Sequence, residues 1–125
     1  MNFHNLMIIT AIATIGFGTG FIIAPKALIA LYGLSSTPII EFSLRLYATA
    51  IFGIGALALL IRHAQNHDIQ KSVLLAFFII DFGGFLVALF ANLAELMNFL
   101  GWSLVVLFLI FSGAYAYLYF FTKSA

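Results

Sequence analysis

Four long apolar stretches, separated by short polar segments, dominate the pattern of hydrophobic and polar positions along the chain. They cover approximately residues 6–24, 39–61, 70–93 and 99–121. Each is close to the roughly 20 residues that an α-helix needs to cross a bilayer. Because the connections are short, consecutive helices are expected to run antiparallel. The pattern therefore predicts an all-α, transmembrane up-down four-helix bundle, with residues 1–125 forming a single integral membrane domain.

Residues that favour helix ends refine these boundaries. Pro25 has no N–H to donate and suits the first position of a new helix. A short helix is expected from Pro25 to Tyr32, stopped by Gly33 as a left-handed cap and lying at the membrane interface between the first two spans. Thr37 and Pro38 predict the start of the second span, and Asp68 is expected to cap the third.

Composition agrees with lipid as the solvent and excludes several classes of function. Hydrophobic residues make up 65% of the chain and charged residues 7%, against about half and a quarter in soluble proteins. A net charge of +1 leaves no basic face dense enough for nucleic acid. The chain has no cysteine, so disulfides and thiolate metal sites are excluded, and no cofactor is expected.

The distribution of basic residues predicts the orientation. An even number of spans places both termini and the loop over residues 62–71 on one side of the membrane. That side carries three basic residues and the opposite side two, and the cytoplasmic side of a membrane protein carries the excess. Both termini are therefore predicted to be cytoplasmic.

Asp81 is the most informative polar residue, because it lies about 15 Å deep in the third span, near the bilayer midplane. An ionised carboxylate there costs at least roughly 2.5 to 3.5 kcal/mol. Asp81 is the first residue of a stripe of small and polar residues that recur every three or four positions. The stripe continues through Gly84, Ala88, Asn92 and Glu95. This stripe is predicted to face the interior of the bundle.

Arg45 in the second span is predicted to point inward as well, within reach of Asp81. Glu41, one turn earlier, and Glu95 compete for the same guanidinium near the interface. Two interpretations stay open for this intramembrane polar site. It is either an internal staple that fixes the register of the helices, or a site for a substrate or a proton.

Small residues gather at a similar depth, at Gly16, Gly20, Gly55 and Gly84. Gly16 and Gly20 form a small-xxx-small pair, which lets helices approach closely in lipid. Tight packing is the expected role. The alternative is a cavity beside Asp81 for a small apolar molecule, lined by Thr14, Ser112 and Tyr115.

His63 and His67 stand four residues apart, a spacing that places two imidazoles on one face of a helix. A zinc site and a solvated loop are the two interpretations. No Glu general base stands between the histidines, so the pair is not a metalloprotease motif, and no metal is expected.

Several positions together resemble the small DoxX-like four-span bacterial membrane proteins. They are Pro25, Leu31-Tyr32-Gly33, Arg45 at the head of a glycine-rich second span, and Gly101-Trp102 at the start of the fourth. The resemblance covers most of the chain and implies a multi-pass protein of the bacterial inner membrane. Some members of such families are linked to quinone-dependent or redox complexes, but no catalytic residue carries over to this sequence.

Three functions are consistent with these observations, and no catalytic motif distinguishes an enzyme among them. The favoured hypothesis is an accessory subunit in the lipid bilayer that packs against another membrane protein or forms a homo-oligomer. The second is a small-molecule or proton-coupled transporter that uses Asp81. The third is a membrane enzyme that acts on a lipid or quinone through Asp81 and Arg45.

Overall fold

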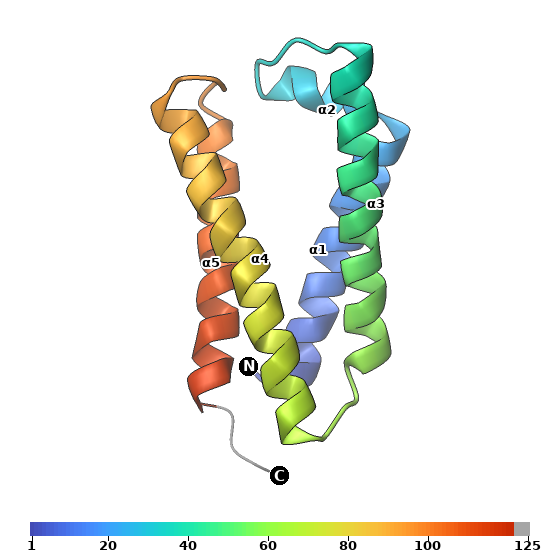
Figure 1. The fold of residues 1–125 in the computed structure, drawn as a ribbon, viewed down its shortest axis with the longest axis vertical. Coiled ribbons are helices and arrows are strands. Elements are labelled where there is room, and N and C mark those ends of the chain that lie inside the picture. Colours follow the sequence, from blue (N-terminus) through green and yellow to red (C-terminus); the bar gives the residue numbers. More distant parts are fainter. Residues whose placement is uncertain (122–125) are drawn as a thin grey trace. The chain divides into compact units, whose positions relative to one another are not determined.

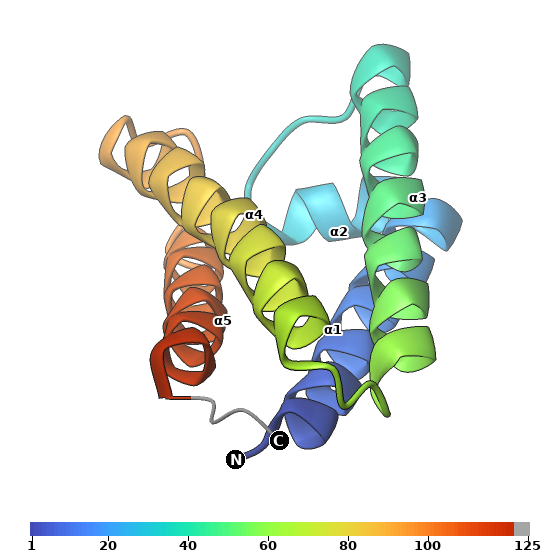
Figure 2. The same ribbon diagram turned by 60° about the horizontal axis from the view of Figure 1, so that its bottom comes forward.

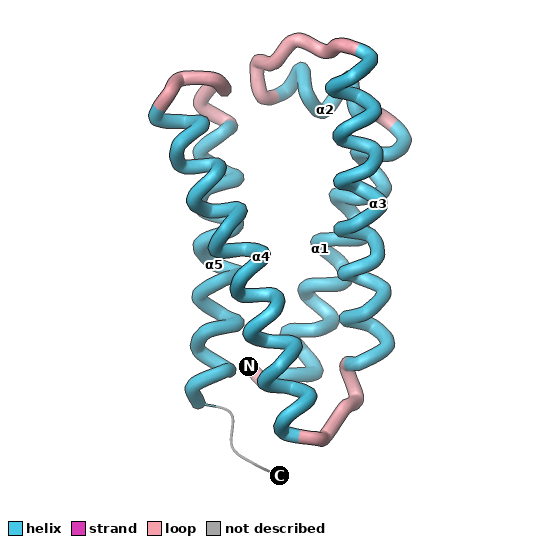
Figure 3. The backbone as a smooth tube through the Cα atoms, in the orientation of Figure 1, coloured by secondary structure: helices cyan, strands magenta, loops and turns pink. Residues whose placement is uncertain are grey.

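The computed structural model describes residues 1–121, and all the regular secondary structure in that range is helical (Figures 1 and 3). The helices are α1 (Phe3–Ile23), α2 (Pro25–Leu31), α3 (Pro38–Ile61), α4 (His67–Leu93) and α5 (Gly101–Phe121). All except α2 are long and apolar enough to cross a membrane, so the chain is a multi-pass membrane protein. The predicted all-α class and the short helix between the first two spans are confirmed.

The chain divides into two compact units, Met1–His63 and Ala64–Ala125. In the N-terminal unit, α1 packs along α3, and the short helix α2 contacts both of them (Figure 1). In the C-terminal unit, α4 packs along α5 (Figure 2). Each unit is thus built on a helical hairpin with antiparallel spans. A single domain over residues 1–125 stays a prediction.

Side-chain caps fix where the long helices begin. Thr37 caps α3 as predicted, because its hydroxyl accepts a hydrogen bond of 3.3 Å from the N–H of Ile40. The prediction that Asp68 caps α4 is wrong. The cap is Asn66, whose side-chain oxygen accepts from the N–H of Ile69 at 3.1 Å. Asp68 lies inside the first turn instead, where its negative charge favours the positive end of the helix dipole.

Two helices end in the same backbone motif. Gly33, with φ of 77°, follows α2, and Glu95, with φ of 58°, follows α4. In both turns, the N–H of the next residue donates to a carbonyl five residues back, as in a Schellman motif. The left-handed conformation suits glycine at position 33, as predicted, but it strains a side-chain-bearing residue at position 95.

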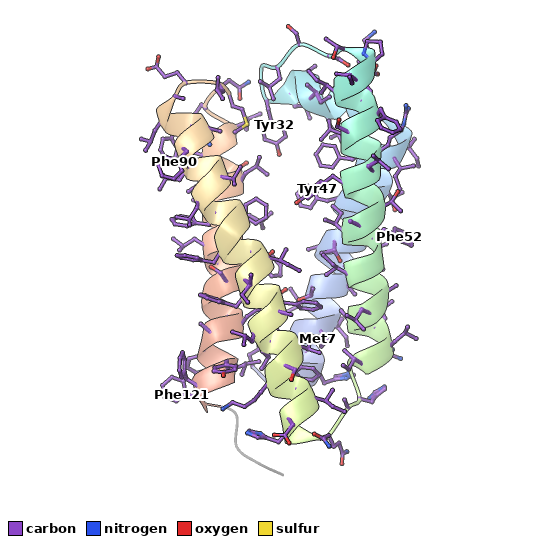
Figure 4. The ribbon with its side chains drawn as sticks, in the orientation of Figure 1. Met7, Tyr32, Tyr47, Phe52, Phe90 and Phe121 are labelled. Carbon is purple, nitrogen blue, oxygen red and sulfur yellow. The ribbon has the colours of Figure 1, made fainter. Side chains whose placement is uncertain are left out.

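The outer faces of the helices carry large apolar side chains. Phe90 and Phe121, for example, are each 68% exposed and project away from their helices (Figure 4). Such a surface would be costly in water and is expected when acyl chains are the solvent.

Candidate functional site

Asp81 lies on the face of α4 that packs against α5. Phe77, one turn before it, meets the ring of Tyr115 edge-on at a centroid distance of 5.5 Å. Gly84, one turn after it, is so close to α5 that an added Cβ would lie 2.8 Å from the ring of Phe108. Because residues at spacings of three and four share a helix face, Asp81 belongs to the same contact surface.

The register of the hairpin places Asp81 opposite the part of α5 between Phe108 and Tyr115. Ser112, which the sequence assigned to a cavity beside Asp81, lies in this part and is buried. Its hydroxyl donates to the carbonyl of Leu109 at 3.1 Å within its own helix. The two predicted cavity-lining residues of α5, Ser112 and Tyr115, therefore lie near the level of Asp81, whereas the cavity itself stays a prediction.

The surroundings of Asp81 are mainly aromatic. Tyr115 is 1% exposed, and its ring also lies 6.2 Å from that of Phe111, so two aromatic rings of α5 lie near the level of Asp81. Within the described part of the C-terminal unit, residues 64–121, the carboxyl group has no hydrogen-bond partner. Since an ionised carboxylate without a donor is costly in an apolar medium, a role for Asp81 in holding a proton or a polar ligand stays a prediction.

Asn92 is the residue of the predicted stripe whose side chain forms hydrogen bonds within residues 64–121, through its NH2 group, while its Oδ1 is buried without a partner there. It is 6% exposed, and its Nδ2 donates to the carbonyls of Ala88 at 2.8 Å and Gly101 at 3.0 Å. An added Cβ on Gly101 would collide with Oδ1 of Asn92. Sequence reasoning placed Asn92 on the stripe without assigning it a role. The useful signal was an amide near the end of one span, followed closely by a glycine at the start of the next.

Glu95 departs from the predicted stripe. The helix ends at Leu93, so Glu95 lies in the following turn, and its left-handed backbone leaves the side chain exposed. Extending the spacing of three and four residues past the end of α4 was therefore wrong, because that spacing marks a common face only while the backbone remains helical.

Arg45 forms a specific contact inside the N-terminal unit. Its Nε donates to the main-chain carbonyl of Ile22 at 3.2 Å, near the end of α1. The last carbonyls of a helix have no N–H partner within it, and Arg45 supplies one from the neighbouring helix. Arg45 is exposed, while Glu41 is half-buried in the first turn of α3. The pairing of Arg45 with Asp81 stays a prediction.

The small residues of the N-terminal unit fall into two groups. An added Cβ on Gly55 would lie 2.5 Å from the hydroxyl of Thr14, which donates to the carbonyl of Thr10 at 2.7 Å. An added Cβ on Gly20 would lie 3.1 Å from Leu28 of α2. Thr14, Gly20 and Gly55 therefore pack between helices. Gly16 is open, because, apart from its neighbouring residues and the backbone of its own helix, no atom of its unit lies within 4 Å of an added Cβ.

The histidines do not share a helix. The chain is non-helical between Ile61 and His67, so the argument that His63 and His67 occupy one helical face is wrong. His63 instead stacks on His4 at a centroid distance of 4.8 Å, and Nδ1 of His4 lies 3.3 Å from the carbonyl of Arg62. Residues 1–121 contain no group of three or more metal-ligating side chains.

Comparison with known proteins gives no relative: no family model matches the chain, and no curated protein or solved structure matches it.

Proposed function

We propose that this multi-pass membrane protein is a small accessory subunit, which assembles through helix–helix contacts with another membrane protein or with copies of itself. A contrast between two sets of glycines supports the proposal. One set is closely packed inside the hairpins, at Gly18, Gly55, Gly84 and Gly101. The other set has no atom of its own unit within 4 Å of an added Cβ, at Gly16, Gly53, Gly83 and Gly113.

The open glycines have no packing role within their own hairpins. Glycine inside a helix costs roughly 0.5 to 1 kcal/mol relative to alanine. In lipid, however, a glycine on an outer face allows the backbone of another helix to approach closely, which is how many membrane helices associate. Gly16 on α1 and Gly53 on α3 fit this role in the N-terminal unit, and a DoxX-like relationship is compatible with it.

Bulky substitutions at these two positions test the accessory role. We expect Gly16→Leu and Gly53→Leu to lower the yield of co-purified partner, or of homo-oligomer, from native membranes without lowering helix content. Ala27→Leu is the matched control, because Ala27 is exposed on the short helix α2 and gains similar bulk outside the spans. If both glycine variants assemble like the control, these glycines form no contact and the proposal loses its support.

A proton-coupled transporter is the second candidate, favoured by the unpartnered carboxyl group of Asp81 in residues 64–121. We expect Asp81→Asn, which preserves shape but cannot ionise, to abolish solute-driven collapse of a pH gradient in proteoliposomes. Asp68→Asn at the exposed start of α4 is the control. Transport that survives in Asp81→Asn excludes this mechanism, and an Asp81→Asn protein that fails only to assemble favours the accessory role.

A further inference from the structure

Charge is unevenly distributed between the two units. Residues 1–63 carry three basic residues and only one acidic residue, whereas residues 64–125 carry two basic and three acidic residues. Two of the three cations in the first unit, Lys26 and Arg45, belong to the end where α1 finishes and α2 begins. The single acidic residue of the unit, Glu41, is half-buried one turn before Arg45.

The contact with Ile22 fixes where Arg45 is held and leaves part of its guanidinium uncommitted. Nε is bound to the carbonyl at the end of α1, whereas the two terminal nitrogens have no hydrogen-bond partner within residues 1–63. The side chain is exposed. A guanidinium anchored in this way presents its remaining donors in a fixed fork, which matches the oxygens of a phosphate.

Lys26 is a second cation, close in sequence to the carbonyl of Ile22 that holds Arg45. It follows Ile22 by four residues, in the first turn of α2, and is exposed without a hydrogen-bond partner within residues 1–63. Its flexible stem lets the ammonium group approach the same anion as Arg45. The two positive charges of Lys26 and Arg45 exceed the single negative charge of Glu41. The region where α1 ends and α2 begins, called the corner below, therefore attracts negative charge.

The depth of the corner identifies the anion. The spanning helix α1 ends at Ile23, and α2, which starts at Pro25, contacts both α1 and α3. The end of a spanning helix lies at the level of the lipid phosphates. We infer that Lys26 and Arg45 bind the phosphate of an acidic phospholipid at this corner. The inference does not depend on the proposed accessory role.

Native mass spectrometry of the full chain in detergent tests the inference. The protein is titrated with short-chain phosphatidylglycerol, with phosphatidylcholine of the same chain length, and with inorganic phosphate. We expect preferential binding of phosphatidylglycerol, weakened about fivefold by Lys26→Gln and at least as much by Arg45→Gln. Arg62→Gln is the matched control, because it removes the third cation of the unit, which follows the opposite end of α3.

The set of variants separates the alternatives. Arg45→Gln also removes the bond to Ile22, so a loss of helix content by circular dichroism would make Lys26→Gln the deciding variant. Lys26→Gln with wild-type affinity overturns the inference, and so does an equal loss of affinity in Arg62→Gln. Equal affinity for phosphatidylcholine excludes recognition of an acidic lipid. If inorganic phosphate binds as strongly as the lipid, the site is one for the free ion instead.

Discussion

Asp81 and Asn92 lie on one face of α4, but within residues 64–121 only the NH2 group of Asn92 forms hydrogen bonds, and its Oδ1 is buried without a partner there. The amide of Asn92 has two N–H donors, and both find main-chain carbonyls, on its own helix and at the start of α5. An ionised carboxylate has no donor, so the main-chain carbonyls that hold Asn92 cannot hold Asp81. Asn92, near the end of the span, therefore joins the end of α4 to the start of α5, whereas Asp81, in the middle of the span, has no such contact within residues 64–121.

The strained backbone at Glu95 yields a prediction at the scale of one residue. Glu95→Gly is expected to raise the free energy of unfolding by about 1 kcal/mol, because glycine adopts the left-handed conformation without steric cost. Unfolding by SDS in mixed micelles, followed by circular dichroism, measures the change. The matched control is Gly33→Ala at the equivalent position after α2, which is expected to lower stability by about the same amount. A destabilised Glu95→Gly protein would show that the side chain of Glu95 has an undetected role.

At the scale of elements, side-chain caps determine where helices begin. Hydrophobicity placed the start of the first span near residue 6, but α1 begins at Phe3, because the side chain of Asn2 accepts from the N–H of Asn5 at 2.8 Å. Apolar length identifies the segment that crosses the membrane, whereas a helix continues as far as its polar end groups are satisfied. The predicted segments therefore matched the helices in number and differed at their ends.

The contact between α1 and α3 gives a prediction that compares two glycines on one helix. Gly55→Ala is expected to lower the free energy of unfolding by roughly 1 to 3 kcal/mol, because its Cβ would overlap Thr14 and Ile15. Gly53→Ala is expected to be neutral or to stabilise by up to about 1 kcal/mol, since that position is open within its unit. The same SDS titration measures both variants. Equal effects of the two substitutions would contradict the packing assigned to Gly55.

At the scale of the whole molecule, a spanning α3 requires the loop before it and the loop after it to lie on opposite sides of the membrane. The chain has no cysteine, so single cysteines can report this directly. Ser35→Cys, between α2 and α3, and Gln65→Cys, between α3 and α4, are both at exposed positions. We expect an impermeant thiol reagent added to intact cells to label only Ser35→Cys, with the unsubstituted chain as the control. Labelling of both from one side would exclude a spanning α3.

The sequence by itself determined the helical class, the number of spanning helices and the short helix at Pro25, because apolar length and proline act locally along the chain. Only the tertiary structure decided which polar side chains are satisfied. It bound Arg45 to Ile22, placed Asn92 against Gly101 and left Asp81 without a hydrogen-bond partner in residues 64–121. Helical spacing gives the face on which a side chain lies, but the partner of that side chain depends on the register of a second helix, which no local pattern encodes.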